Sequence, residues 1–219
     1  MNSRIGAAFR IDARRATLAC LVAVLALALD FGFGSKFPFS PVRLIYSALF
    51  IGLLLGLGRN DRASLGLRLA PKQGFKYWAR AAAFIGLTLG TTMLLIYGAF
   101  LLLGLPTHEA GPPAASGAFV LWMLRALLVA PILEEPLYRV VLVSGLRAVF
   151  PSWAVILIDG LAFAALHFLY GSADITNALA GFVLSWAFLK SESISIPVSL
   201  HFFGNLCVVL INVVGWSLH

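Results

Sequence analysis

The amino-acid sequence predicts an all-α integral membrane protein, a polytopic bundle of about seven (six to eight) transmembrane helices. Hydrophobic residues make up 61% of the 219 residues and charged residues only 11%, whereas a soluble domain carries about 25% charged residues. The mean hydropathy is +0.96. Apolar runs approaching the ~20 residues of a spanning helix recur along the whole chain, and turn-forming residues separate them.

Seven apolar runs are candidates for spanning helices. They cover residues of about 16–34, 41–58, 77–104, 117–143, 152–171, 174–190 and 195–217. The first follows four arginines, as in a signal peptide, but no clear cleavage site ends it, so we interpret it as a retained helix that ends near Asp30 at the interface. The fourth contains Pro131 and Pro136. Because proline kinks or breaks a helix, an extra or re-entrant segment is most expected there.

The distribution of Lys and Arg predicts the orientation. With a cytoplasmic N-terminus, twelve of these residues fall in inner segments and two, Lys36 and Arg43, in outer ones. The positive-inside rule favours this arrangement and accounts for the net charge of +7. We therefore expect a bacterial inner-membrane protein with the lipid bilayer, and no nucleic acid, as a partner. Arg125 and Arg139 lie inside runs, and one of them is expected to pair with Asp159.

The first candidate cluster is Glu134-Glu135-Pro136-Leu137-Tyr138-Arg139, inside the fourth run. Ionisable residues are costly within a membrane and default to a functional interpretation. Glu135 stands four residues before Arg139, the spacing at which an acid and a base meet on one helix face. Glu134 stands four before Tyr138, whose hydroxyl we expect to bind it. Glu135 is thus predicted to be neutralised, with Glu134 facing a cavity; a purely structural ion-pair cluster is the alternative.

The second candidate cluster is Phe163 with His167, one helical turn apart. Glu134 and His167 stand equally far from the turn at Phe150-Pro151. In an antiparallel hairpin both then lie at one depth, roughly 24 Å from the turn. A carboxylate and an imidazole are therefore predicted to meet within the bilayer, and a structural histidine is the alternative.

The third cluster is His201 with Asn205, four residues apart and so on one helix face. Two functional interpretations stay open. The pair would donate to the oxyanion of a tetrahedral intermediate, or Glu134, His167 and His201 would form a His₂Glu set of the kind that binds catalytic zinc. A hydrogen-bonded cross-link between helices is the structural alternative.

Together, in this order, the three clusters resemble the signature of the CAAX protease and bacteriocin-processing family (also called the Abi family) of intramembrane endopeptidases. That signature is Glu-Glu-x-x-x-Arg, Phe-x-x-x-His and His-x-x-x-Asn on successive helices, and here it reads EEPLYR, FAALH and HFFGN. The resemblance covers residues 117–217. It divides the chain into variable N-terminal helices at 1–115 and a protease core at 116–219, expected to form one structural unit.

The resemblance implies a CAAX-type endopeptidase that hydrolyses a peptide bond in a membrane-anchored or membrane-associated protein. A leader peptide, a sorting tail or a CAAX-like tail would be the substrate. Glu134 would activate a water with help from His167, and His201 and Asn205 would hold the oxyanion. The supporting residues would be Glu135, Arg139, Tyr138 and Phe163.

The catalytic type stays open between a glutamic peptidase and a metalloendopeptidase that uses a divalent ion such as zinc. The adjacent Glu134 and Glu135 look less like a metal site than an HExxH helix does, which favours the metal-free type. The runner-up function is a non-catalytic immunity or scaffold protein that binds a partner through the same cavity. A small proton-coupled transporter is disfavoured because no internal repeat is apparent.

Overall fold

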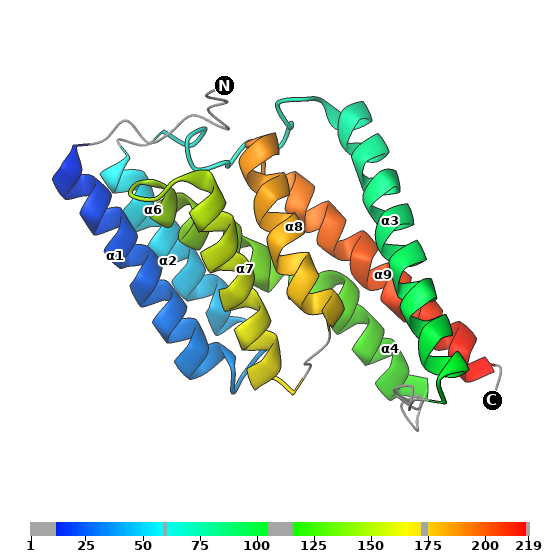
Figure 1. The fold of residues 1–219 in the computed structure, drawn as a ribbon. Helices are drawn as coiled ribbons and strands as arrows, with labels where there is room; N and C mark the ends of the chain where they lie inside the picture. Colours follow the sequence, from blue (N-terminus) through cyan, green and yellow to red (C-terminus); the bar gives the residue numbers. More distant parts are fainter. Residues whose placement is uncertain (1–11, 59–60, 105–115, 172–174, 218–219) are drawn as a thin grey trace.

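The computed structural model describes residues 12–58, 61–104, 116–171 and 175–217. Within these ranges every regular element is a helix, which confirms the all-α prediction (Figure 1). The elements are α1 (Ala13–Leu29), η1 (Asp30–Gly34), α2 (Val42–Leu57), α3 (Phe75–Leu102), α4 (Ser116–Leu124), η2 (Arg125–Val129), α5 (Ala130–Glu135), η3 (Pro136–Val143), α6 (Ser144–Arg147), α7 (Ser152–Leu169), α8 (Ile175–Ser191) and α9 (Ser195–Ser217), where η marks a π-helical stretch.

These elements form one helical stretch for each of the seven predicted runs, with ends that differ by a few residues. Four stretches in the described residues are long and apolar enough to cross a membrane: Ala13–Gly34, Phe75–Phe100, Gly117–Arg147 and Ser152–Leu169. Val42–Leu57 and Ser195–Ile211 are shorter apolar helices. The protein is therefore an integral membrane protein of helical type.

The fourth run is one continuous helical stretch, so the expectation of a break at its prolines is wrong. The chain absorbs the prolines by switching to π-helical turns, in which the hydrogen bond reaches five residues back instead of four. The Ala130 amide donates to the Arg125 carbonyl in this way, and Pro136 begins the second π-helical stretch, η3. Both π-helical stretches lie next to the polar residues of the site.

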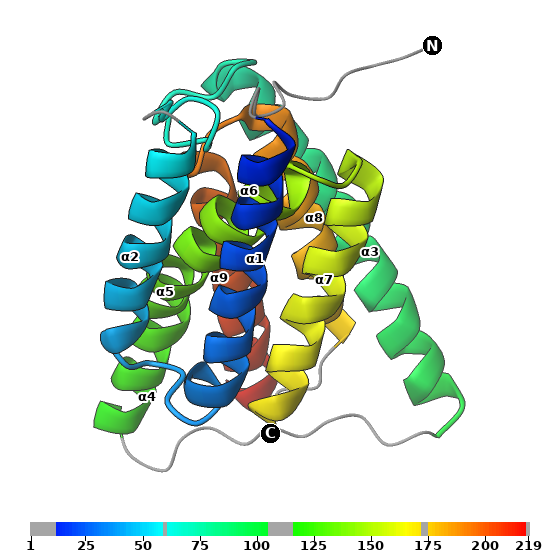
Figure 2. The same ribbon diagram turned by 90° about the vertical axis from the view of Figure 1, so that its left-hand side faces the viewer.

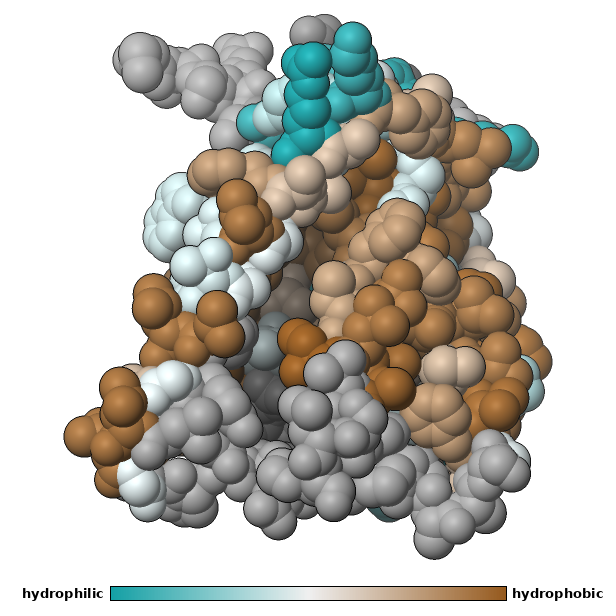
Figure 3. All heavy atoms as spheres, turned by 90° about the vertical axis from the view of Figure 1, so that its right-hand side faces the viewer, coloured by the Kyte–Doolittle hydropathy of each residue, from teal (hydrophilic) through white to brown (hydrophobic). Residues whose placement is uncertain are grey.

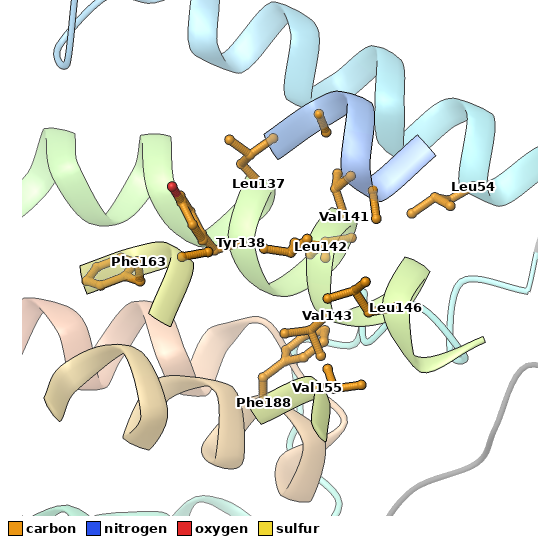
Figure 4. Packing of buried hydrophobic residues seen from close by; sticks show 14 of the residues in the cluster. Leu54, Leu137, Tyr138, Val141, Leu142, Val143, Leu146, Val155, Phe163 and Phe188 are labelled. Atoms are coloured by element: carbon orange, nitrogen blue, oxygen red, sulfur yellow. The ribbon is translucent and has the colours of Figure 1, made fainter. Parts of the chain in front are cut away.

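Helices α1 and α2 pack against α6 and η3 (Figure 2). The contact is close because small residues line it: Ala19, Ala23 and Ala26 of α1 are fully buried. A Cβ atom on Gly145 would lie only 2.6 Å from the Ala19 carbonyl oxygen. The core continues along η3 and α6 through buried aliphatic and aromatic side chains (Figure 4).

Helices α7 and α8 form a second close pair. A Cβ atom on Gly181 of α8 would lie 3.0 Å from the carbonyl oxygen of Gly160 on α7. Such close approach of small residues is common between helices in membranes. It holds the two helices at the spacing that the polar side chains between them require.

Helix α3 packs on the bundle near its start, where Trp78 is buried with Ala187 and Ile196, and it diverges from α8 along its length (Figure 1). Its side chains are largely exposed, among them Phe84, Leu87 and Leu94. Figure 3 views the molecule from this side: hydrophobic residues cover most of the face and hydrophilic residues gather at its upper end. An apolar outer surface of this kind is the surface expected of a helix in contact with lipid.

Candidate active site

A cavity of about 960 Å³ is lined by all four residues predicted to be catalytic: Glu134, His167, His201 and Asn205. They come from α5, α7 and α9, three helices that the chain brings together around the middle of the bundle. The three sequence clusters therefore meet at one site.

Glu134 has the most exceptional surroundings of the four. Its side chain is 5% exposed, and its Oε2 atom is buried without a hydrogen-bond partner among the described residues. Its Oε1 atom lies 3.7 Å from Nη1 of Arg43. A buried acceptor without a partner costs free energy, and such a group at a cavity wall is a candidate for binding a reacting molecule.

Glu135 is fully occupied, as predicted. Its Oε2 accepts from Nε of Arg139 at 2.8 Å, and its Oε1 lies 2.7 Å from Nδ1 of His201. Because a carboxylate paired with arginine is an acceptor, His201 Nδ1 carries the proton of this bond. His201 of α9 is therefore in direct contact with Glu135 of α5.

Arg139 also binds Asp159 and Ser185, which confirms the expected pairing of Asp159 with one of the two intramembrane arginines. We call Glu135, Arg139, Asp159 and Ser185 the Arg139 cluster. All four side chains are fully buried. The ion pairs compensate charges that would otherwise be very costly in the apolar interior.

Phe163 and His167 lie on one face of α7, and the Phe163 ring packs against both histidines. Its centroid is 4.4 Å from the His167 ring and 6.0 Å from the His201 ring. His167 Nδ1 is 2.9 Å from the Phe163 carbonyl oxygen. A carbonyl only accepts, so Nδ1 donates, and in a neutral imidazole Nε2 is then the acceptor.

Glu134 and His167 line the same cavity. Their equal distances from the Phe150-Pro151 turn predicted that they would lie at one depth and meet. No hydrogen bond or ion pair joins them among the residues that the structure describes. The imidazole closest to Glu134 is instead that of His201, with Nε2 at 4.0 Å from Glu134 Oε2.

Asn205 has a partner that the sequence did not suggest. Its Nδ2 donates to the Ala126 carbonyl at 2.7 Å. In the π-helical register of η2, where Ala130 donates to Arg125, the next amide would serve Ala126, but residue 131 is a proline and has no N–H. Asn205 supplies the missing donor and retains one further N–H.

The predicted bond from Tyr138 to Glu134 is wrong. The Tyr138 hydroxyl donates instead to Oδ2 of Asp30 at 3.2 Å. Because α1 packs against η3, the Asp30 carboxylate at the end of α1 lies within reach of this hydroxyl.

Asp30, Arg43 and Tyr46 of the N-terminal helices were missed as site residues. Arg43 binds both Asp30 oxygens at 2.9 Å, and the Tyr46 hydroxyl also donates to Asp30. We call Asp30, Arg43, Tyr46 and Tyr138 the Arg43 cluster. Asp30 and Arg43 are fully buried, so neither is the interfacial or loop residue expected. Their opposite charges at facing ends of two consecutive helices were the available signal.

Tyr170 is a second residue that the sequence interpretation missed. It lines the cavity next to His167, with ring centroids 5.6 Å apart. Its hydroxyl oxygen is buried and has no hydrogen-bond partner among the described residues.

The donors for a metal do not cluster. Among the described residues, no three His, Cys, Asp or Glu side chains are placed to hold one ion. The His₂Glu set of Glu134, His167 and His201 is therefore spread around the cavity, and the observed donor geometry does not match the tetrahedral set that zinc prefers.

Comparison with known proteins supports the resemblance. Residues 116–207 match the family model described as "Type II CAAX prenyl endopeptidase Rce1-like". No curated protein and no solved structure matches the chain. The matched residues contain all three motifs and every cavity residue to which the resemblance gave a role. Residues 116–207 are thus similar to a family of CAAX-type membrane proteases, and this similarity supports the resemblance of the three motifs.

Proposed function

We propose that the protein is a glutamic-type intramembrane endopeptidase in which Glu134 activates the water that attacks a peptide bond. The observation that carries this proposal is the Oε2 atom of Glu134, a residue that lines the cavity: the atom is buried and has no hydrogen-bond partner among the described residues. A general base must reach the proton that it removes. Its oxygen must therefore be free to accept.

The neighbouring Glu135 does not fit this role. Both of its oxygens are occupied, one by Arg139 and one by His201. Glu135 instead orients His201, just as a buried carboxylate orients the imidazole of a catalytic triad. The adjacent acids therefore divide the work: Glu134 accepts a proton and Glu135 positions a histidine.

A water between Glu134 and the histidines would be well placed for attack. Glu134 Oε2 and His201 Nε2 are 4.0 Å apart, a separation that one water at about 2.8 Å from each atom would bridge. His167, with Nδ1 committed to the Phe163 carbonyl, offers Nε2 as a second acceptor for the same proton.

The reaction follows from these positions. The water oxygen attacks the carbonyl carbon of the substrate while Glu134 takes its proton. The tetrahedral oxyanion accepts hydrogen bonds from His201 Nε2–H and from the remaining N–H of Asn205. In this proposal His201 carries protons on both nitrogens, and the two glutamates beside it balance the charge. Glu134 then gives the proton to the leaving amine, and the carbon–nitrogen bond breaks.

The test is Glu134→Gln, which preserves shape and removes the base. The variant and the wild type are expressed with membrane-anchored substrates that carry leader peptides or sorting tails, and the products are separated by electrophoresis. We expect Glu134→Gln to lower cleavage at least about 100-fold, as loss of a general base does, with unchanged membrane insertion. Cys207→Ser, on the exposed face of α9, is the matched control.

Full cleavage by Glu134→Gln would overturn the proposal. If the variant keeps its cellular phenotype without any cleavage by the wild type, the protein is instead a binding or immunity factor. Cleavage by wild-type protein that stops on chelation, and returns with zinc, would reassign the reaction to a metalloendopeptidase.

A further inference from the structure

The two ends of the helix bundle differ in charge. One end carries the start of α1 and residues 61–74. This segment folds against the end of α8: Lys72 N–H donates to the Ser191 carbonyl at 2.9 Å, and Ser193 donates to the Arg68 carbonyl at 2.6 Å. The described basic residues near this end are Arg14, Arg15, Arg62, Arg68, Lys72, Lys76, Arg80, Arg147 and Lys190. We call it the basic end.

In the described residues, the connections of the opposite end carry few basic side chains. The sequence count placed Lys36 and Arg43 there, but Arg43 is buried against Asp30. That leaves Lys36 as the basic residue of the described connections at this end, against the nine described residues of the basic end. The structure thus sharpens the charge bias, and the positive-inside rule assigns the basic end to the cytoplasm.

The cavity leads away from the basic end. Its lining follows α4 from Ala118 down to Glu134 in α5, sixteen residues that span roughly 24 Å. At the outer end it is lined by Phe39, Gly171 and Ile175, all exposed.

The other side of Glu134 is closed toward the basic end. Leu137, Val141, Val143 and Leu146 are buried and pack against neighbouring helices (Figure 4). None of the described residues of the basic end lines the cavity.

From these observations we propose that the site takes its substrate from the non-cytoplasmic side of the membrane. This inference rests on the proposed function. The substrate class is an exported polypeptide that presents an extended stretch to the mouth near Ile175. A tail that emerges only at the cytoplasmic face does not reach the cavity.

Cysteine labelling tests the direction of access without using activity. Cys20 and Cys207 are first replaced by alanine. Ile175→Cys then marks the mouth and Leu69→Cys marks the basic end. The two residues are matched controls, because both are aliphatic and exposed, at 59% and 78%. A membrane-impermeant maleimide is added to spheroplasts of a bacterial host before and after permeabilisation.

We expect Ile175→Cys to be labelled in intact spheroplasts and Leu69→Cys only after permeabilisation. The reverse pattern, or labelling of both before permeabilisation, overturns the inference. The Glu134→Gln cleavage assay is repeated in the same cysteine-free protein. It tests the proposed function separately, because labelling does not depend on catalysis.

An independent observation concerns Tyr170, whose buried hydroxyl has no described partner and belongs to a residue of the cavity wall. We infer that this hydroxyl donates a hydrogen bond to the oxyanion of the intermediate. It complements Asn205, one of whose N–H groups is already bound to Ala126. This inference also rests on the proposed function.

Tyr170→Phe removes the donor and keeps the ring. We expect kcat to fall roughly 100-fold, as loss of one oxyanion donor does, with KM and thermal stability unchanged. Tyr77→Phe on α3, which does not line the cavity, is the control. If Tyr170→Phe keeps the kcat of the wild type while the separate variant Glu134→Gln is inactive, Tyr170 does not bind the oxyanion. The proposed function of Glu134 would still stand.

Discussion

Two buried ionic clusters flank Glu134, and they differ in how far apart their members lie in the chain. The Arg139 cluster lies wholly within residues 116–207, the part that matches the family model. The Arg43 cluster combines Asp30, Arg43 and Tyr46 of α1–α2 with Tyr138 of η3, up to 108 residues away. The N-terminal helices, which lie outside the family match, therefore supply a cation next to the central acid. The site therefore includes residues outside the three sequence motifs.

The two clusters also act on different acids. Within the Arg139 cluster, the guanidinium of Arg139 binds the Glu135 carboxylate directly, at 2.8 Å. The Arg43 cluster reaches Glu134 across 3.7 Å without a hydrogen bond. One cluster thus fixes a side chain in place, whereas the other provides an electrostatic field at a group left free to react. This distinction predicts different consequences when each is disrupted.

Disruption of the Arg139 cluster is expected to have the larger effect on stability. Arg139→Leu leaves the carboxyl groups of Glu135 and Asp159 buried without their cation, a change that costs about 3–5 kcal/mol in proteins. The expected result is a large fall in thermal stability of the purified protein in detergent, with loss of folded monomer by size-exclusion chromatography.

Lys72→Gln provides the control for that variant. Lys72 pairs with Glu192 at 3.0 Å but its side chain is 56% exposed, and exposed ion pairs contribute about 0–1 kcal/mol. Equal stability of the two variants would mean that the buried cluster holds nothing together.

Disruption of the Arg43 cluster is expected to change activity more than stability. Asp30→Asn with Arg43→Gln removes both charges of the pair, so Asp30 is not left as a buried acid without its cation. Glu134 loses the guanidinium that lies 3.7 Å from its Oε1 atom. We therefore expect cleavage to fall about tenfold, which corresponds to about 1.4 kcal/mol, as measured with the same membrane-anchored substrates.

Tyr46→Phe is the matched variant for this prediction, because it removes a hydrogen bond to Asp30 and leaves Arg43 in place. Its cleavage rate should equal that of the wild type. An unchanged cleavage rate in the double variant would show that the N-terminal helices only support the fold.

An effect of similar size on activity is expected for Asn205→Ala. Asn205 belongs to the third motif, and one N–H of its amide donates to the Ala126 carbonyl. It therefore links two helices as well as offering a hydrogen bond to the oxyanion. We expect kcat to fall about tenfold and the melting temperature to fall by a few degrees, since one buried carbonyl loses its donor. A changed melting temperature with unchanged kcat would make Asn205 a structural residue alone.

Much of the fold follows from local sequence signals. The helix positions were predictable because apolar runs and turn residues are local, and the pairs Glu135–Arg139 and Phe163–His167 because four-residue spacing fixes a shared helix face. Asp159 followed from the need to neutralise a buried arginine. The division at residue 116 and the roles given to the motif residues stay predictions.

The misses have a common physical origin. Tyr138 binds Asp30, which comes from the distant N-terminal helices, instead of Glu134. The Arg43 cluster depends on contacts 13 and 108 residues apart, and no local period encodes such contacts. The charge count treated Arg43 as a loop residue because burial is invisible to a count. Each miss thus concerns tertiary geometry.

The most direct test of the central claim, that Glu134 activates a water, is a single-turnover cleavage in water enriched in ¹⁸O. Excess enzyme is mixed with a substrate, and the new carboxyl terminus is analysed by mass spectrometry. If Glu134 acts as a general base, every product molecule carries one ¹⁸O atom after the first turnover. Product without ¹⁸O in that turnover would mean that an oxygen of the protein had attacked the peptide bond, and would contradict the account.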